Sequence, residues 1–482
     1  MRRPIALLAS TLLLAAPAGA TTLVGRAVLP SATFAPGPTS GQFITGANGV
    51  AVPFTDAQPV QGFSGIIAGP VPGTFGVLLD NGFGAKSNSA DSVLRLFTVR
   101  PDFTTGQVTP VDTVTGAASS FGATNWYTTL SDPAAKAGFT IVANQATYPN
   151  GGNSVPVAAS IRDGKLLTGA DFDPEGVARG KDGSLYFGDE FGPFLLHTDA
   201  AGTLLSTPVP LPNLTGVGGN PLIQSPDYPT PAAGSALPGR TGASNAQGSG
   251  GFEGFTISPD KSRIYTVLEK GLTGGPGGTR YVNVFDTATG RFTDQLFRFR
   301  TGDPSGDNNG IDPAANSIGD VSMINDHQML VLERDGGQGA ASRFKRVYLV
   351  DLNQLDADGF ARKTLLADLL NVSDPGNLGG NGTVAGVFTF PFTTIEEVIA
   401  IDANTILVGN DNNYPFSSGR TPGLADDNEL ALIRLDTMLD LDPSLVLPGV
   451  VPGIAAVPEP ATLGLLGVAL GLAGALRRRG RA

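Results

Sequence analysis

Short apolar segments separated by turns dominate this chain of 482 residues. The segments run for four to six residues between Gly, Asp, Asn and Pro, as in SLYFGDE (184–190), RIYTVLE (263–269) and TILVGND (405–411). None has the length or the 3.6-residue period of an amphipathic helix, so the pattern predicts β-strands.

These segments repeat as hairpins that carry an acidic or amide residue at each end. The two positions are fifteen residues apart in three repeats, Glu175–Glu190, Asp320–Asp335 and Glu397–Asn412, and sixteen apart in Glu253–Glu269. Gly65 and Asp80 repeat the spacing of fifteen, without the first carboxylate. A second pair of strands follows each hairpin, so every repeat predicts a four-stranded antiparallel sheet.

Consecutive four-stranded units are typical of a β-propeller. We expect an all-β propeller of six blades, with five visible and the sixth within 80–175. The last unit lacks an outer strand, which TTLVGRAVLP (21–30) would supply to close the ring. Two β-sandwich domains are the alternative. The Gly/Pro/Ser-rich stretches 206–250 and 301–318 predict long loops, either flexible or functional.

Both ends of the chain have the pattern of targeting segments. Residues 1–20 combine two arginines, an apolar run and Ala-Gly-Ala, which predicts a secretory signal peptide. Residues 457–482 combine Pro-Glu-Pro, an apolar stretch and four arginines, and they resemble the PEP-CTERM sorting signal. We therefore expect an exported domain at 21–456, in the cell envelope or outside the cell, anchored transiently by its tail and processed by sorting machinery.

The amino-acid composition excludes several kinds of binding and metal site. Without the two ends, 25 basic and 42 acidic residues give a net charge of −17, which argues against nucleic-acid binding. The chain has no cysteine and two histidines, so thiolate and multi-histidine metal sites are excluded. We expect a monomer.

The repeated acidic positions predict a metal site. In a propeller, equivalent positions of successive blades converge at one mouth of the central channel. Crowded carboxylates raise one another's pKa unless a cation compensates them, and Ca²⁺ accepts six to eight oxygen ligands. Asx turns and solvated surface are the alternative explanation. The expected Ca²⁺ ligands are Asp80, Glu175, Asp189, Glu190, Glu253, Glu269, Asp320, Glu333, Glu397 and Asp411, with Asp335 and Glu396 on the same rim.

Basic residues near these units have two interpretations. They either orient a phosphate or carboxylate group, or pair with neighbouring acids; we favour pairing for most, including Arg334. They are Lys86, Arg95, Arg179, Lys270, Arg280, Arg334, Arg343 and Lys345.

Longer motifs resemble the phytase-like β-propeller family described as having esterase-like activity of phytase. The most specific are Asp-Pro-Glu-Gly and Asp-Glu-Phe-Gly-Pro within 172–205, and the segments 78–97, 251–270, 317–337 and 393–415 continue the resemblance. Carried over by position, the acidic motif sites fall on Glu175, Asp189, Glu190, Glu253, Asp320 and Glu333. Glu396-Glu397-Val398 replaces the family's Glu-Gly, and the basic clamp of a phytase is not recognisable.

The resemblance implies a hydrolase of phosphate esters or related esters, acting on a small molecule. We expect an exported, calcium-dependent enzyme in which Glu175 or Glu190 positions the attacking water. The alternative is a non-catalytic, calcium-stabilised binding module at the cell surface, associated with exopolysaccharide.

Overall fold

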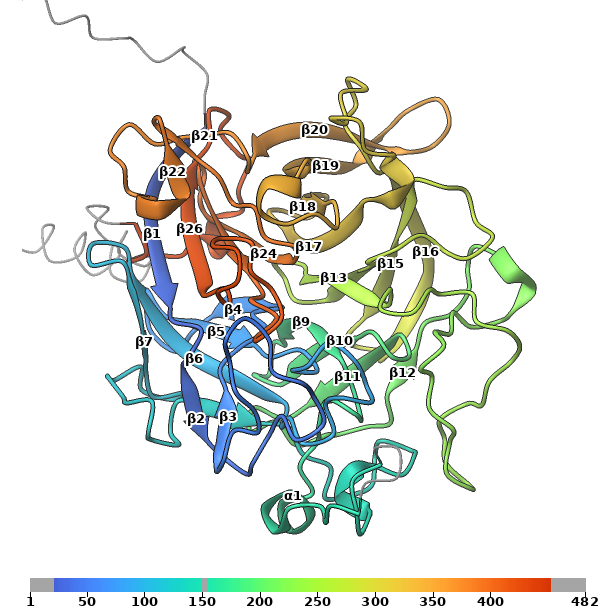
Figure 1. The fold of residues 1–482 in the computed structure, drawn as a ribbon. Helices are drawn as coiled ribbons and strands as arrows, with labels where there is room; N and C mark the ends of the chain where they lie inside the picture. The colour runs from blue at the N-terminus through green and yellow to red at the C-terminus, as the bar shows by residue number, and fades with distance from the viewer. Residues whose placement is uncertain (1–20, 150–153, 452–482) are drawn as a thin grey trace, which may run out of the picture.

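A computed structural model describes residues 21–149 and 154–451. Five four-stranded antiparallel sheets, two of which join edge to edge with short strands into one twelve-stranded sheet, stand around a common centre in this part of the chain (Figure 1). The signal peptide and the sorting tail expected from the sequence lie outside the described residues. No helix among the described residues is both long and apolar enough to cross a membrane.

Each sheet is one blade, numbered I to V in chain order from its innermost strand. Blade I consists of β4 (Ile66–Ala68), β5 (Phe75–Leu78), β6 (Arg95–Asp102) and β7 (Gln107–Pro110). Blade II consists of β9 (Pro174–Arg179), β10 (Leu185–Asp189), β11 (Phe194–Thr198) and β12 (Val209–Pro210). Blade III consists of β13 (Phe252–Ile257), β14 (Arg263–Leu268), β15 (Thr279–Asp286) and β16 (Arg291–Arg300).

The last two blades complete the ring. Blade IV consists of β17 (Ser317–Met323), β18 (Gln328–Arg334), β19 (Lys345–Leu355) and β20 (Ala361–Asp368). Blade V consists of β24 (Ile395–Asp402), β25 (Thr405–Asn410), β26 (Asn428–Arg434) and the N-terminal β1 (Thr22–Leu29). The innermost strands contact one another in the order β4, β9, β13, β17, β24 and back to β4. This closed ring confirms the propeller and excludes two sandwiches.

The N-terminal strand closes the ring as the sequence predicted. β1 pairs antiparallel with β26 from the other end of the chain, with Arg26 opposite Ala431. Its residues alternate between half-buried and buried, the period of a strand with one face in the core. The outer edge of blade V is therefore supplied by the first described segment.

The expectation of six blades is wrong for the described residues, which form five. The interval 80–175 contains the outer half of blade I, β8 (Tyr127–Thr129) paired to β6, and the short helices η1 (Val142–Asn144) and α1 (Ala159–Gly164). Ile141, Val142 and Ile161 are buried beside residues of blades I and II. The apolar residues that suggested a sixth blade therefore belong to the hydrophobic core between blades I and II.

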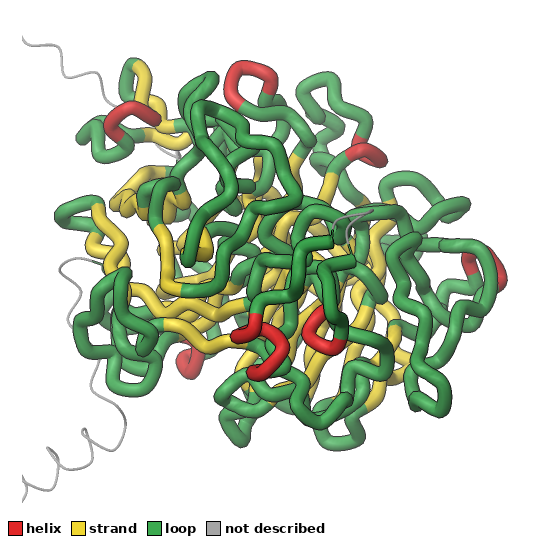
Figure 2. The backbone as a smooth tube through the Cα atoms, turned by 60° about the horizontal axis from the view of Figure 1, so that its bottom comes forward, coloured by secondary structure: helices red, strands yellow, loops and turns green. Residues whose placement is uncertain are grey.

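Short strands and 3-10 turns lie outside the five blades. The remaining strands are β2 (Phe34–Pro36), β3 (Ala57–Pro59), β21 (Val372–Ser373), β22 (Thr383–Val384) and β23 (Val387–Phe388). The remaining 3-10 turns are η2 (Val217–Gly219), η3 (Pro313–Ala315), η4 (Gly339–Ala341), η5 (Gly380–Gly382) and η6 (Pro443–Leu445). Figure 2 shows long loops in front of the strands on one side of the molecule.

The hydrophobic core lies in layers between neighbouring blades. Tyr186 of blade II packs with Phe255 and Phe285 of blade III, and Val331 of blade IV packs with Val267 of blade III. The other layers join blades IV and V, V and I, and I and II. The inner strands of the blades are buried on both faces and therefore consist of nearly continuous apolar runs, as in β10, β18 and β25.

Candidate metal and catalytic site at the channel mouth

The hairpin geometry brings acidic residues to one mouth of the central channel. Glu175, Glu253 and Glu396 each stand second in an innermost strand, while Glu190 and Glu269 directly follow the neighbouring strand. In an antiparallel hairpin the start of the first strand lies beside the end of the second. The two acidic ends of each repeat therefore meet at the same end of the blade.

A small cavity of about 140 Å³ lies at this mouth. Eight carboxylate side chains and one guanidinium group line it, together with polar residues and glycine. The lining residues are Asp80, Asn81, Gly84, Asp173, Glu175, Glu190, Ser249, Glu253, Glu269, Arg334, Thr394, Glu396, Asp411 and Asn413. We call this the acidic cavity. It contains six of the residues expected as ligands: Asp80, Glu175, Glu190, Glu253, Glu269 and Asp411.

In blades II, III and V, a β-bulge directs one glutamate of the innermost strand toward this cavity. The pairing of β13 with β14 skips Glu253, and that of β24 with β25 skips Glu396; Glu175 is skipped in the same way in blade II. A bulged residue leaves the ladder and its side chain is re-aimed. The three bulged glutamates are therefore structurally equivalent.

Blade IV breaks the acidic pattern. Its bulged residue is Gly319, where a Cβ atom would lie 2.0 Å from the carbonyl oxygen of Ile395 in the next blade, so a side chain cannot be accommodated there. Fifteen residues later stands Arg334, in the place that Glu190 and Asp411 hold in their blades. One blade therefore contributes a cation to a ring of acids.

Arg334 pairs with glutamates from two other blades. Its Nη2 lies 3.1 Å from Glu253 Oε1, 3.1 Å from Glu269 Oε1 and 2.9 Å from Glu396 Oε1. Burial lowers its pKa, but these three carboxylates outweigh that effect and raise it above the usual value. The expectation that Arg334 pairs with neighbouring acids is confirmed.

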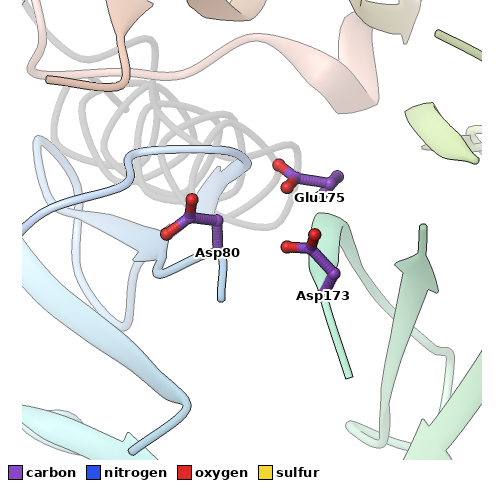
Figure 3. A group of neighbouring side chains, drawn as sticks. All are labelled: Asp80, Asp173 and Glu175. Carbon is purple, nitrogen blue, oxygen red and sulfur yellow. The ribbon is translucent and has the colours of Figure 1, made fainter. Parts of the chain in front are cut away.

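Three carboxylates on the blade I and blade II side of the cavity form no ion pair with a basic side chain among the described residues. Asp173 and Glu175 extend from the start of β9 toward Asp80, and oxygens of the three lie within 4.8 Å of one another (Figure 3). Glu175 belongs equally to a second group, with Glu253 and Glu396, that meets the same limit. Its Oε2 is buried and has no hydrogen-bond partner among the described residues.

Backbone and amide groups hold this acidic group in position. Asn81 donates from its backbone nitrogen to Asp173 Oδ1 at 3.0 Å and from its side chain to Oδ2 at 2.7 Å. The amide of Gly82 donates to Asp80 Oδ1 at 2.7 Å. The amide of Gly251 donates to Glu190 Oε1 at 3.0 Å. These donors fix the carboxylates before any ligand arrives.

Burial and mutual repulsion raise the pKa of these acids. The pKa of Asp80 is well above its usual value, first through burial and then through Asp411 and Asp173. The pKa of Glu175 is raised by burial, then by Asp173 and Glu253. Ionising the whole group therefore requires a compensating cation.

The residues present fit a hard divalent cation. The cavity offers carboxylate and amide oxygens, and Glu175 Oε2 is a buried oxygen with no hydrogen-bond partner in the described part of the chain. Eight carboxylates face one guanidinium group in the lining. Oxygen-only donor sets with this charge suit Ca²⁺ and exclude thiolate-seeking metals.

Four of the expected ligands lie outside the acidic cavity. Both oxygens of Asp189 accept backbone N–H groups, from Asp173 and Gly192, and those of Asp320 accept from Val321 and Val398. Glu333 pairs with Lys363 and accepts from the amide of Gly302. These carboxylates support the backbone, so our proposed ligand set leaves them out.

Glu397 is the fourth residue outside the cavity. It is fully buried against Gly409 in β25, and both oxygens lack hydrogen-bond partners in the described part of the chain. Burial, then Asp320 and Glu396, raises its pKa well above the usual value. The sequence pattern indicated Glu397 because Asn412 follows it at the repeated spacing of fifteen residues. The bulge instead places the neighbouring Glu396 in the cavity.

Asp173 lines the acidic cavity, but the repeated spacing of fifteen residues did not indicate it. It precedes β9 and therefore lies outside the repeated pair of positions. The signal for it was present in the Asp-Pro-Glu-Gly motif, whose first residue it is. Its two oxygens contact Asn81 from blade I, which only the packing of two blades reveals.

The fold and site define the class: a propeller with a buried, acidic, metal-compatible cavity at one channel mouth. The chain matches the family model "Phytase-like: Esterase-like activity of phytase" over residues 58–414. It belongs to this phytase-like family. It also matches the PEP-CTERM protein-sorting motif at 456–479, which indicates export and C-terminal membrane anchoring.

Individual relatives are more distant. An uncharacterized secreted protein of Arthroderma benhamiae is 32% identical over 145 residues, which cover 27% of this chain and 27% of the relative. The periplasmic gluconolactonase of Pseudomonas aeruginosa is 14% identical, with a TM-score of 0.30 over 80% of this chain and 90% of that chain. The PQQ-bound aldose sugar dehydrogenase of Streptomyces coelicolor is 12% identical, with a TM-score of 0.30 over 87% and 99%. At these TM-scores the two structures carry no argument about function.

Proposed function

We propose that this protein is an exported, calcium-dependent hydrolase of phosphate esters or related esters. The observation that carries the proposal is Glu175, which belongs to two carboxylate groups at the channel mouth and whose buried Oε2 has no hydrogen-bond partner among the described residues. Membership of the phytase-like family supports the reaction class. The mature domain would span 21–456, between a signal peptide at 1–20 and the sorting segment at 457–482; the mass of the exported protein tests this division.

The acidic cavity would hold the cation through residues of several blades. The proposed ligands are Asp80, Asp173 and Glu175, with Glu190, Glu253, Glu269, Glu396 and Asp411 completing the cavity. When bound, Ca²⁺ supplies a Lewis acid that lowers the pKa of water and offsets the charge of the substrate. Arg334 keeps three of the glutamates in position and limits the negative charge on its side of the cavity.

Glu190 is the proposed general base. The amide of Gly251 fixes its Oε1, which leaves Oε2 to accept a proton from the attacking water. Water adds to phosphorus as Glu190 takes one of its protons, the bond between phosphorus and the ester oxygen breaks, and Glu190 returns the proton to the leaving alcohol. Burial raises the pKa of Glu190, followed by the effect of Glu269, and a base poised nearer neutral pH accepts a proton more effectively.

Replacement of the two glutamates tests this assignment. We expect Glu175→Gln to lose calcium affinity and turnover together, because it removes the shared ligand. We expect Glu190→Gln to reduce kcat by at least about 100-fold, the usual contribution of a general base. The assays are calcium titration by calorimetry and phosphate release from a phosphomonoester, with calcium and with chelator.

An exposed residue provides the control for this test. Every glutamate in the described part of the chain is buried, so Asp163→Asn on the surface of α1 serves instead. Turnover that survives both glutamate substitutions would contradict the roles assigned to Glu175 and Glu190. Calcium binding without hydrolysis of any ester would favour the non-catalytic cell-surface module.

A further inference from the structure

A second cavity opens beside the acidic cavity. Its volume is about 760 Å³, which is within the range of sites for drug-sized ligands. It shares Gly84, Asp173 and Ser249 with the lining of the acidic cavity. A molecule that reacts at the acidic cavity can therefore extend into this second space, which we call the side pocket.

The side pocket combines aromatic surface with one cation. Phe139 and Phe191 line it, and Lys86 is the only basic side chain among the described residues of its lining. Thr140 and Thr230 add hydroxyl groups. Aromatic faces with a few convergent polar groups are typical of pockets that hold the ring of a small molecule.

Lys86 is positioned at this pocket by two contacts. Its Nζ donates to the carbonyl oxygen of Asp227 at 3.1 Å and lies 5.0 Å from the centre of the Phe191 ring. Both oxygens of the nearby Asp171 accept hydrogen bonds from backbone amides, those of Val142 and Thr168, and not from Lys86. The ammonium group has three protons, so it retains donors for an oxygen of a ligand.

The charge of the two cavities does not suit a polyanion. Their linings hold two basic side chains, Lys86 and Arg334, and Arg334 is engaged by three glutamates. Asp171, Asp173 and Asp227 add negative charge to the side pocket. Clustered arginine and lysine side chains are the usual donors for several phosphates. Each phosphate beyond the one held at the bound cation would meet these carboxylates with Lys86 alone to offset its charge.

We propose that the side pocket holds the ring-bearing alcohol part of a monoester, with Lys86 donating to an oxygen on that ring. The single anionic group of the ester would lie at the acidic cavity. The protein would accordingly select monoesters of cyclic alcohols over inositol polyphosphates. This inference rests on the proposed function and names the substrate class of that site.

Two esters test this selection directly. The probes are 4-nitrophenyl phosphate, which has one phosphate and a ring bearing oxygen, and myo-inositol hexakisphosphate. At equal free calcium, we expect kcat/KM to favour 4-nitrophenyl phosphate by at least about tenfold. Equal or greater efficiency with the hexakisphosphate overturns the inference.

Substitution of Lys86 tests the pocket itself. We expect Lys86→Met to raise KM for 4-nitrophenyl phosphate about tenfold with kcat changed less than about threefold, and Lys86→Arg to restore most of the loss. Lys181→Met is the matched control, because Lys181 is exposed in the turn between β9 and β10. A Lys86→Met variant that behaves like this control overturns the role of Lys86.

Binding to an inactive variant separates this inference from the proposed function. Calorimetry on Glu190→Gln at fixed free calcium measures the affinity for both probes without turnover. Tighter binding of 4-nitrophenyl phosphate, weakened about tenfold by adding Lys86→Met, supports the pocket even if wild-type protein hydrolyses neither ester. Tighter binding of the hexakisphosphate, or no effect of Lys86→Met, overturns it.

Discussion

Single buried carboxyl groups outside the acidic cavity make the stability of this protein depend on pH. Asp91 is fully buried; its Oδ2 accepts from the backbone and side chain of Gln42, while Oδ1 has no partner among the described residues. Burial raises its pKa to about 6. The folded chain therefore binds this proton more tightly than the unfolded chain, in which the pKa of aspartate is about 3.9.

The sign of the pH effect follows from that difference. The contribution of Asp91 is fully present below about pH 4 and is lost as the pH rises through about 6. Asp91→Asn cannot ionise, so we expect it to gain stability relative to wild type by up to about 3 kcal/mol between pH 4 and pH 8. Urea unfolding at both pH values measures this change.

The exposed Asp163 on α1 provides the reference substitution. Asp163→Asn should show the same difference from wild type at both pH values. A difference for Asp91→Asn that stays constant or shrinks with rising pH would show that the side chain is not buried as described.

At the scale of elements, the ring is closed by strand pairing and by a buried ion pair. Arg26 of β1 donates to Glu429 of β26 through Nε at 2.8 Å and Nη2 at 2.6 Å. Arg420 donates to the same carboxylate through Nε at 2.9 Å and Nη2 at 2.8 Å. Burial raises the pKa of Glu429, but Arg420 and Arg26 outweigh it and lower the pKa.

Removing one of these arginines weakens the closure. Arg26→Met leaves the buried Glu429 with half of its charged donors, and we expect a loss of about 2–4 kcal/mol in the free energy of unfolding. The matched control is Arg162→Met, at an exposed position on α1. Equal stability of the two variants in urea would contradict a role for this pair in holding β1.

At the scale of the whole molecule, the acidic cavity links the blades. Asp80 comes from blade I, Glu175 from blade II, Glu253 from blade III and Asp411 from blade V. A cation bound by residues of several blades stabilises the closed ring, because the unfolded chain does not hold these groups together.

Thermal unfolding measures this linkage. At a calcium concentration of about 100 times Kd, binding stabilises the folded state by about 2.7 kcal/mol. We expect Tm to rise by about 3 °C over protein in chelator, and the rise to be lost in Glu175→Gln. A Tm that does not respond to calcium or chelator would contradict a calcium site in the cavity.

Local patterns along the chain were enough to predict the strands and their order. The sequence predicted the hairpins, the acidic residues at both of their ends and the N-terminal strand that completes the last blade. Strand periodicity and turn residues are local properties, so they can be recognised without the fold. Six of the expected ligands reached the cavity for the same reason: antiparallel pairing brings the two ends of each hairpin together.

The number of blades and the residues that make up the site depend on tertiary packing. Register shifts at bulges place Glu396, and not Glu397, in the cavity and leave Gly319 and Arg334 as the blade IV pair. Asp173 and the side pocket depend on how blades and loops pack together. A one-residue shift reverses the face of a strand, and ring closure is a property of all blades together, so residue spacing does not determine either.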